Sequence, residues 1–149
     1  PPRSTLFPYT TLFRSELTRT QIQNGADVVY AAAGGTGSGV YQAAADAGVF
    51  AIGVDSNQNW MQPGTMLTSM LKRVGEASYD SYEAANNGTW EAGFRILGLA
   101  EDGVGWALDE YNRDLITPEM EARVNEARDA IIAGDIVVHD YMADDSCPI

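Results

Sequence analysis

The chain has 149 residues, of which 45% are hydrophobic and 20% are charged, proportions that are usual for one globular domain and exclude a disordered polypeptide. Its 21 acidic side chains outnumber its 9 basic ones and give a net charge of −12, which argues against a surface that binds nucleic-acid phosphates. No apolar run reaches the roughly 18 residues that a membrane-spanning helix needs.

The first 15 residues differ in character from the rest of the chain. They contain no acidic residue and repeat the tripeptide Thr-Leu-Phe. They fit neither a signal peptide, which needs a continuous apolar core, nor a strand, because Pro8 interrupts the pattern. Residues 5–15 resemble the in-frame translation of a short-read sequencing adapter. We therefore expect residues 1–15 to be a cloning or assembly artefact and residues 16–149 to be the natural part of the chain.

From residue 16 onward, helical patterns alternate with apolar strands. A short helix is predicted over residues 16–24 and a second helix over residues 40–47, each followed by a glycine that can end it. Apolar runs that predict strands, each followed by a glycine-rich or polar segment or by a helix, occur at residues 27–33, 49–55 and 65–71.

The second half of the chain is predicted to contain two more helices and further short strands. A helix with one apolar face is predicted over residues 72–86. The stretch 90–108 is interpreted as two short strands around a Glu-Asp-Gly turn. Thr117 is a predicted cap for a helix that begins with proline and ends at Gly134. Residues 135–141 are predicted to form a last strand.

This alternation predicts an α/β fold with an open, doubly wound, mainly parallel sheet. Ligands of such sheets bind beyond the carboxyl ends of the strands. Three chemically distinctive features lie at those ends: the glycine-rich turn at residues 34–39, Asp55 and Lys72. We therefore expect a binding site where these three features meet.

The glycine-rich turn follows a strand and opens a helix, a position where backbone N–H groups can receive a polar or anionic ligand group. It lacks the Lys and Ser or Thr of a phosphate-binding loop, because Val40 and Tyr41 follow Gly39. It also lacks the third glycine of a dinucleotide fingerprint, which would fall at position 40, and the pattern of a hydrolase nucleophile turn around Ser38. The alternative is a tight turn that only needs glycine conformations.

Asp55 and Lys72 are the candidate binding side chains. A carboxylate at the end of the second strand can accept two hydrogen bonds from a vicinal diol such as that of ribose, or it can cap a polar loop instead. Lys72 can contact a ligand oxygen or base nitrogen, hold Asp55 in place, or be a solvated lysine. Arg73 and Asp109 are interpreted as solvated surface residues.

At these positions the sequence resembles a known family. The segments GADVVYAAAGGTGSGVYQAA, AIGVDSNQ, LTSMLKRV and GDIVV are similar, in order and spacing, to the basic membrane protein family of substrate-binding lipoproteins of ABC importers, typified by purine-nucleoside receptors. The resemblance spans residues 16–138. It implies part of one lobe of a type I periplasmic-binding-protein fold, in which two α/β lobes close on a ligand.

The resemblance also implies roles for individual residues and for the whole protein. Gly34 and Gly35 would offer backbone groups to the ligand, Asp55 would bind the ribose hydroxyls, and Lys72 would complete the polar end of the site. The implied function is the extracytoplasmic solute-binding component of an ABC importer, without catalysis, cofactor or metal, with permease subunits as partners. Residues 16–149 would be its carboxyl-terminal part, and the amino-terminal lobe and its lipid anchor would lie upstream.

Two other readings stay open at this point. A fragment of a dinucleotide-dependent oxidoreductase would also place Asp55 after the second strand, although the missing third glycine argues against it. The ligand-binding domain of a transcriptional regulator would share the lobe fold. An enzyme with a cysteine nucleophile is not indicated, because His139 and Cys147, the single cysteine, form no evident pair. The acidic residues near the carboxyl end are predicted to form a solvated tail: Asp140, Asp144 and Asp145.

Overall fold

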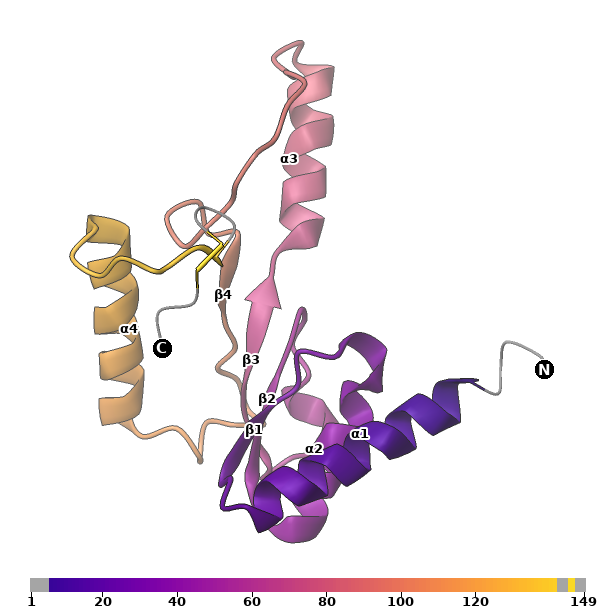
Figure 1. Ribbon diagram of the computed structural model, residues 1–149. Helices are drawn as coiled ribbons and strands as arrows, with labels where there is room; N and C mark the ends of the chain where they lie inside the picture. Colours follow the sequence, from indigo (N-terminus) through magenta and orange to yellow (C-terminus); the bar gives the residue numbers. More distant parts are fainter. Residues whose placement is uncertain (1–5, 142–144, 147–149) are drawn as a thin grey trace. The chain divides into compact units, whose positions relative to one another are not determined.

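A computed structural model of the chain describes residues 6–141 and 145–146 (Figure 1). The chain divides into two compact units, Pro1–Thr117 and Pro118–Ile149. None of the helices in the described residues has the length and apolar character that crossing a membrane requires. The predicted tail residue Asp144 and the cysteine Cys147 lie outside the described residues.

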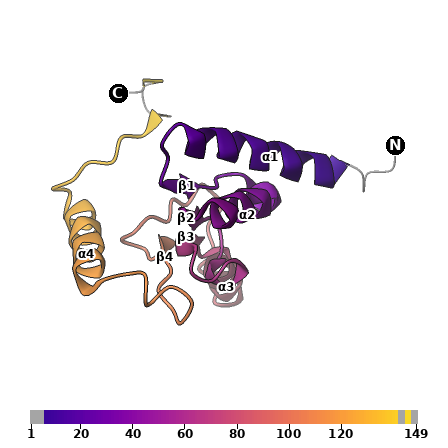
Figure 2. The same cartoon turned by 90° about the horizontal axis from the view of Figure 1, so that it is seen from below.

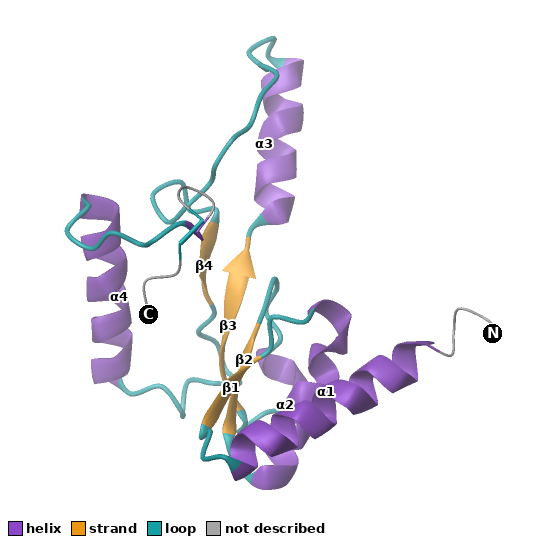
Figure 3. Ribbon diagram, viewed as in Figure 1, coloured by secondary structure: helices purple, strands orange, loops and turns teal. Residues whose placement is uncertain are grey.

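The first unit is built on a four-stranded sheet (Figure 3). Its strands follow one another in the order of the sequence, and the first three are parallel while the fourth runs antiparallel to the third. The strands are β1 (Val28–Tyr30), β2 (Phe50–Gly53), β3 (Met66–Lys72) and β4 (Val104–Trp106). The α/β class and the mainly parallel sheet predicted from the sequence are confirmed.

Three helices belong to the first unit and one to the second. They are α1 (Leu6–Gln23), α2 (Gly37–Ala47), α3 (Val74–Asn86) and, in the second unit, α4 (Pro118–Ala133). Two short 3₁₀ turns, η2 (Gly34–Thr36) and η3 (Asn59–Met61), lie in the loops after β1 and β2. The helices α1 and α2 lie side by side (Figure 2) and cover one face of the sheet.

The core of the first unit lies between this helix pair and the sheet. Alternate residues of a strand point to opposite faces, so one set of strand side chains packs in the core and the other set lies on the opposite face of the sheet. Tyr41 is the largest fully buried side chain of α2, and Tyr30 of β1 is 52% exposed on the opposite face. The buried apolar cluster contains Val29, Ala31, Val40, Tyr41, Ala44, Ala51 and Met66.

The first helix begins earlier than predicted. We expected a helix over residues 16–24, but α1 starts at Leu6 and includes part of the predicted artefact. The reason is a close helix contact: a Cβ atom at Gly39 would lie 2.5 Å from the Thr11 carbonyl oxygen, so glycine allows the backbones to approach. The Ser15 hydroxyl also donates to the Gly39 carbonyl at 2.9 Å. The origin of residues 1–15 stays a prediction.

The interpretation of residues 90–108 as two strands is half wrong. Only Val104–Trp106 forms a strand, and it pairs with the end of β3. The segment before the turn is irregular, and Phe94 and Ile96 are 106% and 92% exposed. Apolar side chains in that segment predicted a strand, but a strand also needs a hydrogen-bonded neighbour, and in the described residues this segment pairs with none.

The predicted strand over residues 135–141 is also wrong. The chain from residue 135 to residue 140 is irregular after α4 ends, and Val137 and Val138 are 86% and 66% exposed. The second unit contains no strand in its described residues, so this apolar segment has no sheet within its own unit to join. The helix before it begins at Pro118, as the Thr117–Pro118 pair predicts.

Candidate functional site

The structure brings Asp55 and Lys72 together at the carboxyl ends of β2 and β3. The Lys72 Nζ atom lies 2.7 Å from Asp55 Oδ1, and the two side chains are 51% and 50% exposed. The backbones are joined as well, because the Lys72 N–H donates to the Asp55 carbonyl at 2.9 Å. The two residues predicted from the sequence therefore form one accessible, charged pair at the edge where ligands of parallel sheets bind.

Asp55 has an unusual backbone conformation. Its φ angle is 71°, and the Ser56 N–H donates to the Val54 carbonyl at 2.9 Å across it, which defines a three-residue turn. Positive φ costs a non-glycine residue energy, although Asp and Asn tolerate it better than other side chains. Strain of this kind gathers at sites where the surrounding structure holds a residue for a purpose.

The electrostatics of the pair keep Lys72 charged. The hydrogen bond to Asp55, and then the charge of that carboxylate, raise the pKa of Lys72 above its ordinary value. The phenol of Tyr30, the last residue of β1, acts in the same direction to a smaller extent. A carboxylate beside an ammonium group can offer both acceptor oxygens and N–H donors to a polar ligand.

Gly34 and Gly35 lie at the same edge of the sheet, in the η2 turn that follows β1. Gly34 has a φ angle of 54° and open space where a Cβ would be, and its carbonyl accepts the Gly37 N–H. The helix α2 begins at Gly37, before the predicted start at residue 40. In the described residues no hydrogen bond joins these two glycines to Asp55 or Lys72. The glycines are related to the pair because they lie at the same edge of the sheet.

Gln58 is a site residue that sequence reasoning missed. Its Oε1 atom accepts the Val54 N–H at 3.1 Å and the Tyr41 hydroxyl at 2.5 Å, and its own N–H donates to Ser69 Oγ at 3.0 Å. It thereby joins the end of β2, the helix α2 and the strand β3. Burial raises the pKa of Tyr41, so its phenol stays a donor.

A second set of polar contacts holds the other end of the same loop. Ser69 and Asn59 are fully buried, and the Ser69 hydroxyl donates to Asn59 Oδ1 at 2.8 Å. The amides of Asn57 and Asn59 donate to Asp109 Oδ2 at 2.6 and 3.1 Å. Asp109, interpreted from the sequence as a solvated residue, is therefore an anchor of this loop, since its carboxylate offers several acceptor positions.

The pKa of Asp109 reflects this role. Burial raises the pKa, but hydrogen bonds from Asn57, the Tyr111 N–H, Asn59 and the Asn112 backbone outweigh burial and lower it. Arg73 was also interpreted as solvated, yet its Nε atom lies 3.2 Å from Asp102 Oδ1. Both corrections have one cause: the partner of each side chain comes from a distant part of the sequence.

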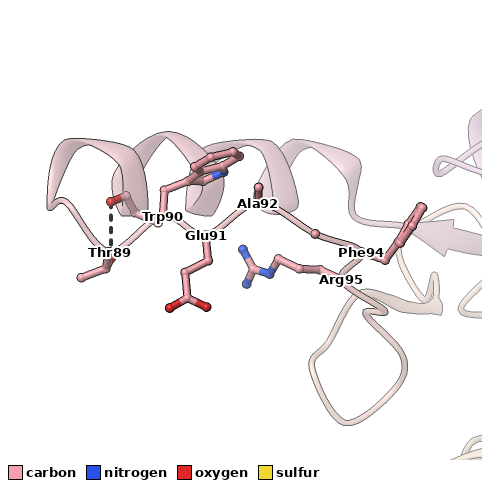
Figure 4. Close-up of a pocket in the computed structure, with 8 residues that line it drawn as sticks. Thr89, Trp90, Glu91, Ala92, Phe94 and Arg95 are labelled. Atoms are coloured by element: carbon pink, nitrogen blue, oxygen red, sulfur yellow. Dashed lines mark hydrogen bonds between the residues drawn. The ribbon is translucent and has the colours of Figure 1, made fainter.

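A separate cavity of about 440 Å³ lies beside the end of α3 (Figure 4). The segment 89–95 lines most of it, together with Ala84, whose carbonyl accepts the Thr89 hydroxyl at 3.3 Å. Phe94 points away from the helix in this view. None of the candidate site residues lines this cavity, so it does not belong to the Asp55–Lys72 site. In the described residues no group of acidic, histidine or cysteine side chains could hold a metal ion.

Comparison with known proteins gives a consistent result. A model of the family described as ABC transporter substrate-binding protein PnrA-like matches residues 13–140. The CD4+ T-cell-stimulating antigen of Listeria monocytogenes is 34% identical over 141 residues, which cover 83% of this chain and 38% of that protein. Basic membrane protein D of Borreliella burgdorferi is 36% identical over 59% of this chain and 27% of that protein.

Solved structures are similar as well. An ABC transporter solute-binding protein from Aeropyrum pernix matches with a TM-score of 0.70 and 26% identity over 87% of this chain and 45% of that chain. A transcriptional activator of the comK gene from Bacillus halodurans matches with a TM-score of 0.74 and 24% identity, a likeness of fold alone. The chain spans less than half the length of each of these proteins.

Proposed function

The chain belongs to the family of PnrA-like ABC transporter substrate-binding proteins, and from this premise we propose that it is the carboxyl-terminal part of a receptor for a nucleoside-like ligand. The receptor is extracytoplasmic, is anchored by a lipid upstream of this sequence, and passes its ligand to permease subunits without chemical change. An uncharacterized lipoprotein of Pyrococcus abyssi, 40% identical over 95 residues, supports the anchored form.

The Asp55–Lys72 pair is the observation that carries the proposed ligand class. A vicinal diol places two O–H donors side by side, and a carboxylate can accept from both. Lys72 fixes the carboxylate from one side at 2.7 Å, and half of each side chain is open to an incoming ligand. A ribose carries such a diol, and a ribonucleoside is the common biological molecule that joins it to a flat base.

The remaining features of the sheet edge fit the same ligand. The Gly34 turn has space for a close approach of a ligand to the backbone, because nothing lies within 4 Å of the position of its Cβ. Tyr30 offers an aromatic ring that is about half exposed at the end of β1. An acidic chain with a net charge of −12 also suits an uncharged nucleoside better than a phosphorylated one.

The test is a titration of the ¹⁵N-labelled chain followed by NMR, which detects weak binding. Small-molecule sites normally enclose most of their ligand, so a site that contacts one side should bind only at about millimolar concentration. We expect inosine to shift the amide signals of Asp55, Ser56 and Lys72, and 2′,3′-dideoxyinosine, which lacks the diol, to leave them unchanged. Equal shifts with both compounds, or none with inosine, would overturn the diol assignment.

A further inference from the structure

The strained turn at Asp55 is held from within the protein by one side chain. Gln58 lies four residues after Val54 in the chain, and its Oε1 atom accepts the Val54 N–H at 3.1 Å. Val54 is 5% exposed, so its N–H needs an acceptor within the protein, and Gln58 Oε1 supplies one. The hydrogen bond therefore favours the arrangement in which the chain leaves β2 at Val54 and turns at Asp55.

Gln58 is itself fixed at two further points. The buried Tyr41 hydroxyl donates to the same Oε1 atom, and the Gln58 N–H donates to the buried Ser69 hydroxyl at 3.0 Å. These partners come from α2 and β3, which are parts of the packed core. With two hydrogen bonds to its side-chain oxygen and one from its backbone N–H, Gln58 has little freedom, so the turn it holds has little freedom as well.

The direction of the Asp55 carboxylate depends on that turn. With its φ angle at 71°, Asp55 places its carboxylate 2.7 Å from Lys72, while its carbonyl accepts the Lys72 N–H. Relaxation to a negative φ would redirect the carboxylate away from Lys72, and it would relieve the strain that the present conformation carries. Something must therefore oppose this relaxation, and Gln58 is the side chain that contacts the turn from the core.

We propose that Gln58 is a positioning residue, which holds the Asp55 turn so that the carboxylate faces Lys72 and is oriented before a ligand arrives. Gln58 acts through Asp55 and needs no contact with the ligand. The value of this orientation for nucleoside binding rests on the proposed function, but the orientation itself is a property of the free protein. Preorganised acceptors bind more tightly because binding need not order them.

The experiment measures the Asp55–Lys72 contact directly, by the pH titration of the Lys72 ¹³Cε signal. The Tyr30 phenol also acts on Lys72, so all variants are made in a Tyr30→Phe background. Asp55→Asn gives the titration midpoint of Lys72 when it has no charged partner. In Gln58→Met, which keeps the side-chain length but has no acceptor oxygen, we expect the Lys72 midpoint to fall to nearly the Asp55→Asn value.

Two further variants separate positioning from general stability. Gln58→Glu keeps the acceptor oxygens and should leave the Lys72 midpoint at or above that of the parent. Gln62→Met is the matched control, because Gln62 lies in the same loop and donates to Gln42 at 3.0 Å, away from the turn. Gln62→Met should leave the titration midpoint of Lys72 unchanged. If Gln58→Met lowers the thermal midpoint but not the Lys72 titration, Gln58 is only a structural residue and the proposal is wrong.

Tyr41→Phe provides a second route if Gln58→Met does not fold. It removes one donor to Gln58 and keeps the core ring, so the Lys72 midpoint should move part of the way toward the Asp55→Asn value, and an unchanged midpoint would count against the proposal. With inosine, Gln58→Met should weaken binding about tenfold, as loss of one oriented charge-assisted contact implies. If the parent binds no nucleoside, the proposed function fails, while the Lys72 titration still decides the role of Gln58.

Discussion

Asp55 and Lys72 are joined twice, once through side chains at 2.7 Å and once through the backbone, where the Lys72 N–H donates to the Asp55 carbonyl at 2.9 Å. The backbone bond does not depend on the charge of either side chain. A substitution that removes one charge therefore leaves the two positions next to each other. Because the backbone hydrogen bond does not depend on the ion pair, the ion pair can be tested by substitution without disturbing the edge of the sheet.

The ion pair should stabilise the fold only while Lys72 is protonated. The pKa of Lys72 is raised in the folded state, so its contribution is complete below the ordinary lysine pKa of about 10.4 and is lost as the pH rises through the folded-state value. The coupling free energy between the two side chains can be measured by urea unfolding of four proteins: the parent, Asp55→Asn, Lys72→Met and the double variant. We expect a small favourable coupling at pH 7 and none above the folded-state pKa.

Because both side chains are about half exposed, this coupling should be small and should shrink further in high salt. Lys72→Met should accordingly change the thermal midpoint very little at pH 7, while it weakens nucleoside binding. A large loss of stability in Lys72→Met would show that Lys72 supports the fold and would remove it from the binding site.

The backbone strain at Asp55 predicts an order of stability among three substitutions. Asn and Gly both accept a φ angle of 71°, whereas Ala has neither a local hydrogen-bonding side chain nor the freedom of glycine. Asp55→Ala should therefore be less stable than Asp55→Gly by about 1 kcal/mol, measured by urea unfolding at pH 7. Equal stability of the two variants would mean that the turn relaxes when the carboxylate is lost, and the strain argument would then fail.

The sequence predicted the presence and order of the first three strands, because apolar runs followed by polar residues mark where a buried strand leaves the core, but the first two strands end earlier than predicted. The runs 27–33 and 49–55 each contain a shorter strand, and the third strand, Met66–Lys72, begins and ends one residue later than the run 65–71. Asp55 and Lys72 could be selected because Asp55 is the last residue of the second run and Lys72 follows directly after the third. The structure adds that the two side chains contact each other, while the binding roles of both residues stay predictions.

The supporting residues could not be predicted in this way. Gln58 looks like any polar loop residue, and its partners Tyr41 and Ser69 lie in a helix and a strand whose patterns report only burial. Asp109 reaches the loop from 50 residues farther along the chain, and no local pattern encodes such a contact. Conversely, residues 135–141 have a strong strand pattern, but the described residues of their unit contain no strand to pair with, so apolar character alone does not form a strand.

Asp109 makes the loop sensitive to acid. Asp109→Asn would replace an acceptor oxygen with an amide group facing the donors of Asn57 and Asn59, and should cost about 1–3 kcal/mol of unfolding free energy at pH 7. The pKa of Asp109 is lowered in the folded state, so its advantage is present above the ordinary value near 3.9 and is lost as the pH falls through the folded-state value.

Urea unfolding from pH 7 to pH 2.5 checks this prediction, with Glu110→Gln as the matched control, because Glu110 is the adjacent exposed carboxylate. The difference between the parent and Asp109→Asn should narrow at the acid end, while Glu110→Gln should follow the parent at every pH. A constant difference between the parent and Asp109→Asn would mean that the amide disrupts packing and that the charge of Asp109 is unimportant.

The close approach of β2 to β3 beneath the site depends on Gly53. A Cβ atom there would lie 2.5 Å from Ser69 Oγ and 3.1 Å from Gln58 Oε1, and neither atom can move freely because both are hydrogen-bonded in the core. Gly53→Ala should therefore cost about 1–3 kcal/mol, the usual range for overpacking. It should also disturb the Asp55 turn, because the displaced Gln58 loses its contact with Val54.

Gly75→Ala is the control for the general effect of replacing glycine. Gly75 lies in the first turn of α3 with nothing within 4 Å of its Cβ position, so alanine should stabilise the chain there by about 0.4–1 kcal/mol. Thermal unfolding of both variants should thus show shifts of opposite sign, and the amide signals of Asp55 and Lys72 should move only in Gly53→Ala. If Gly53→Ala is as stable as the parent and those signals stay in place, the contacts among Gly53, Ser69 and Gln58 do not determine the geometry of the site.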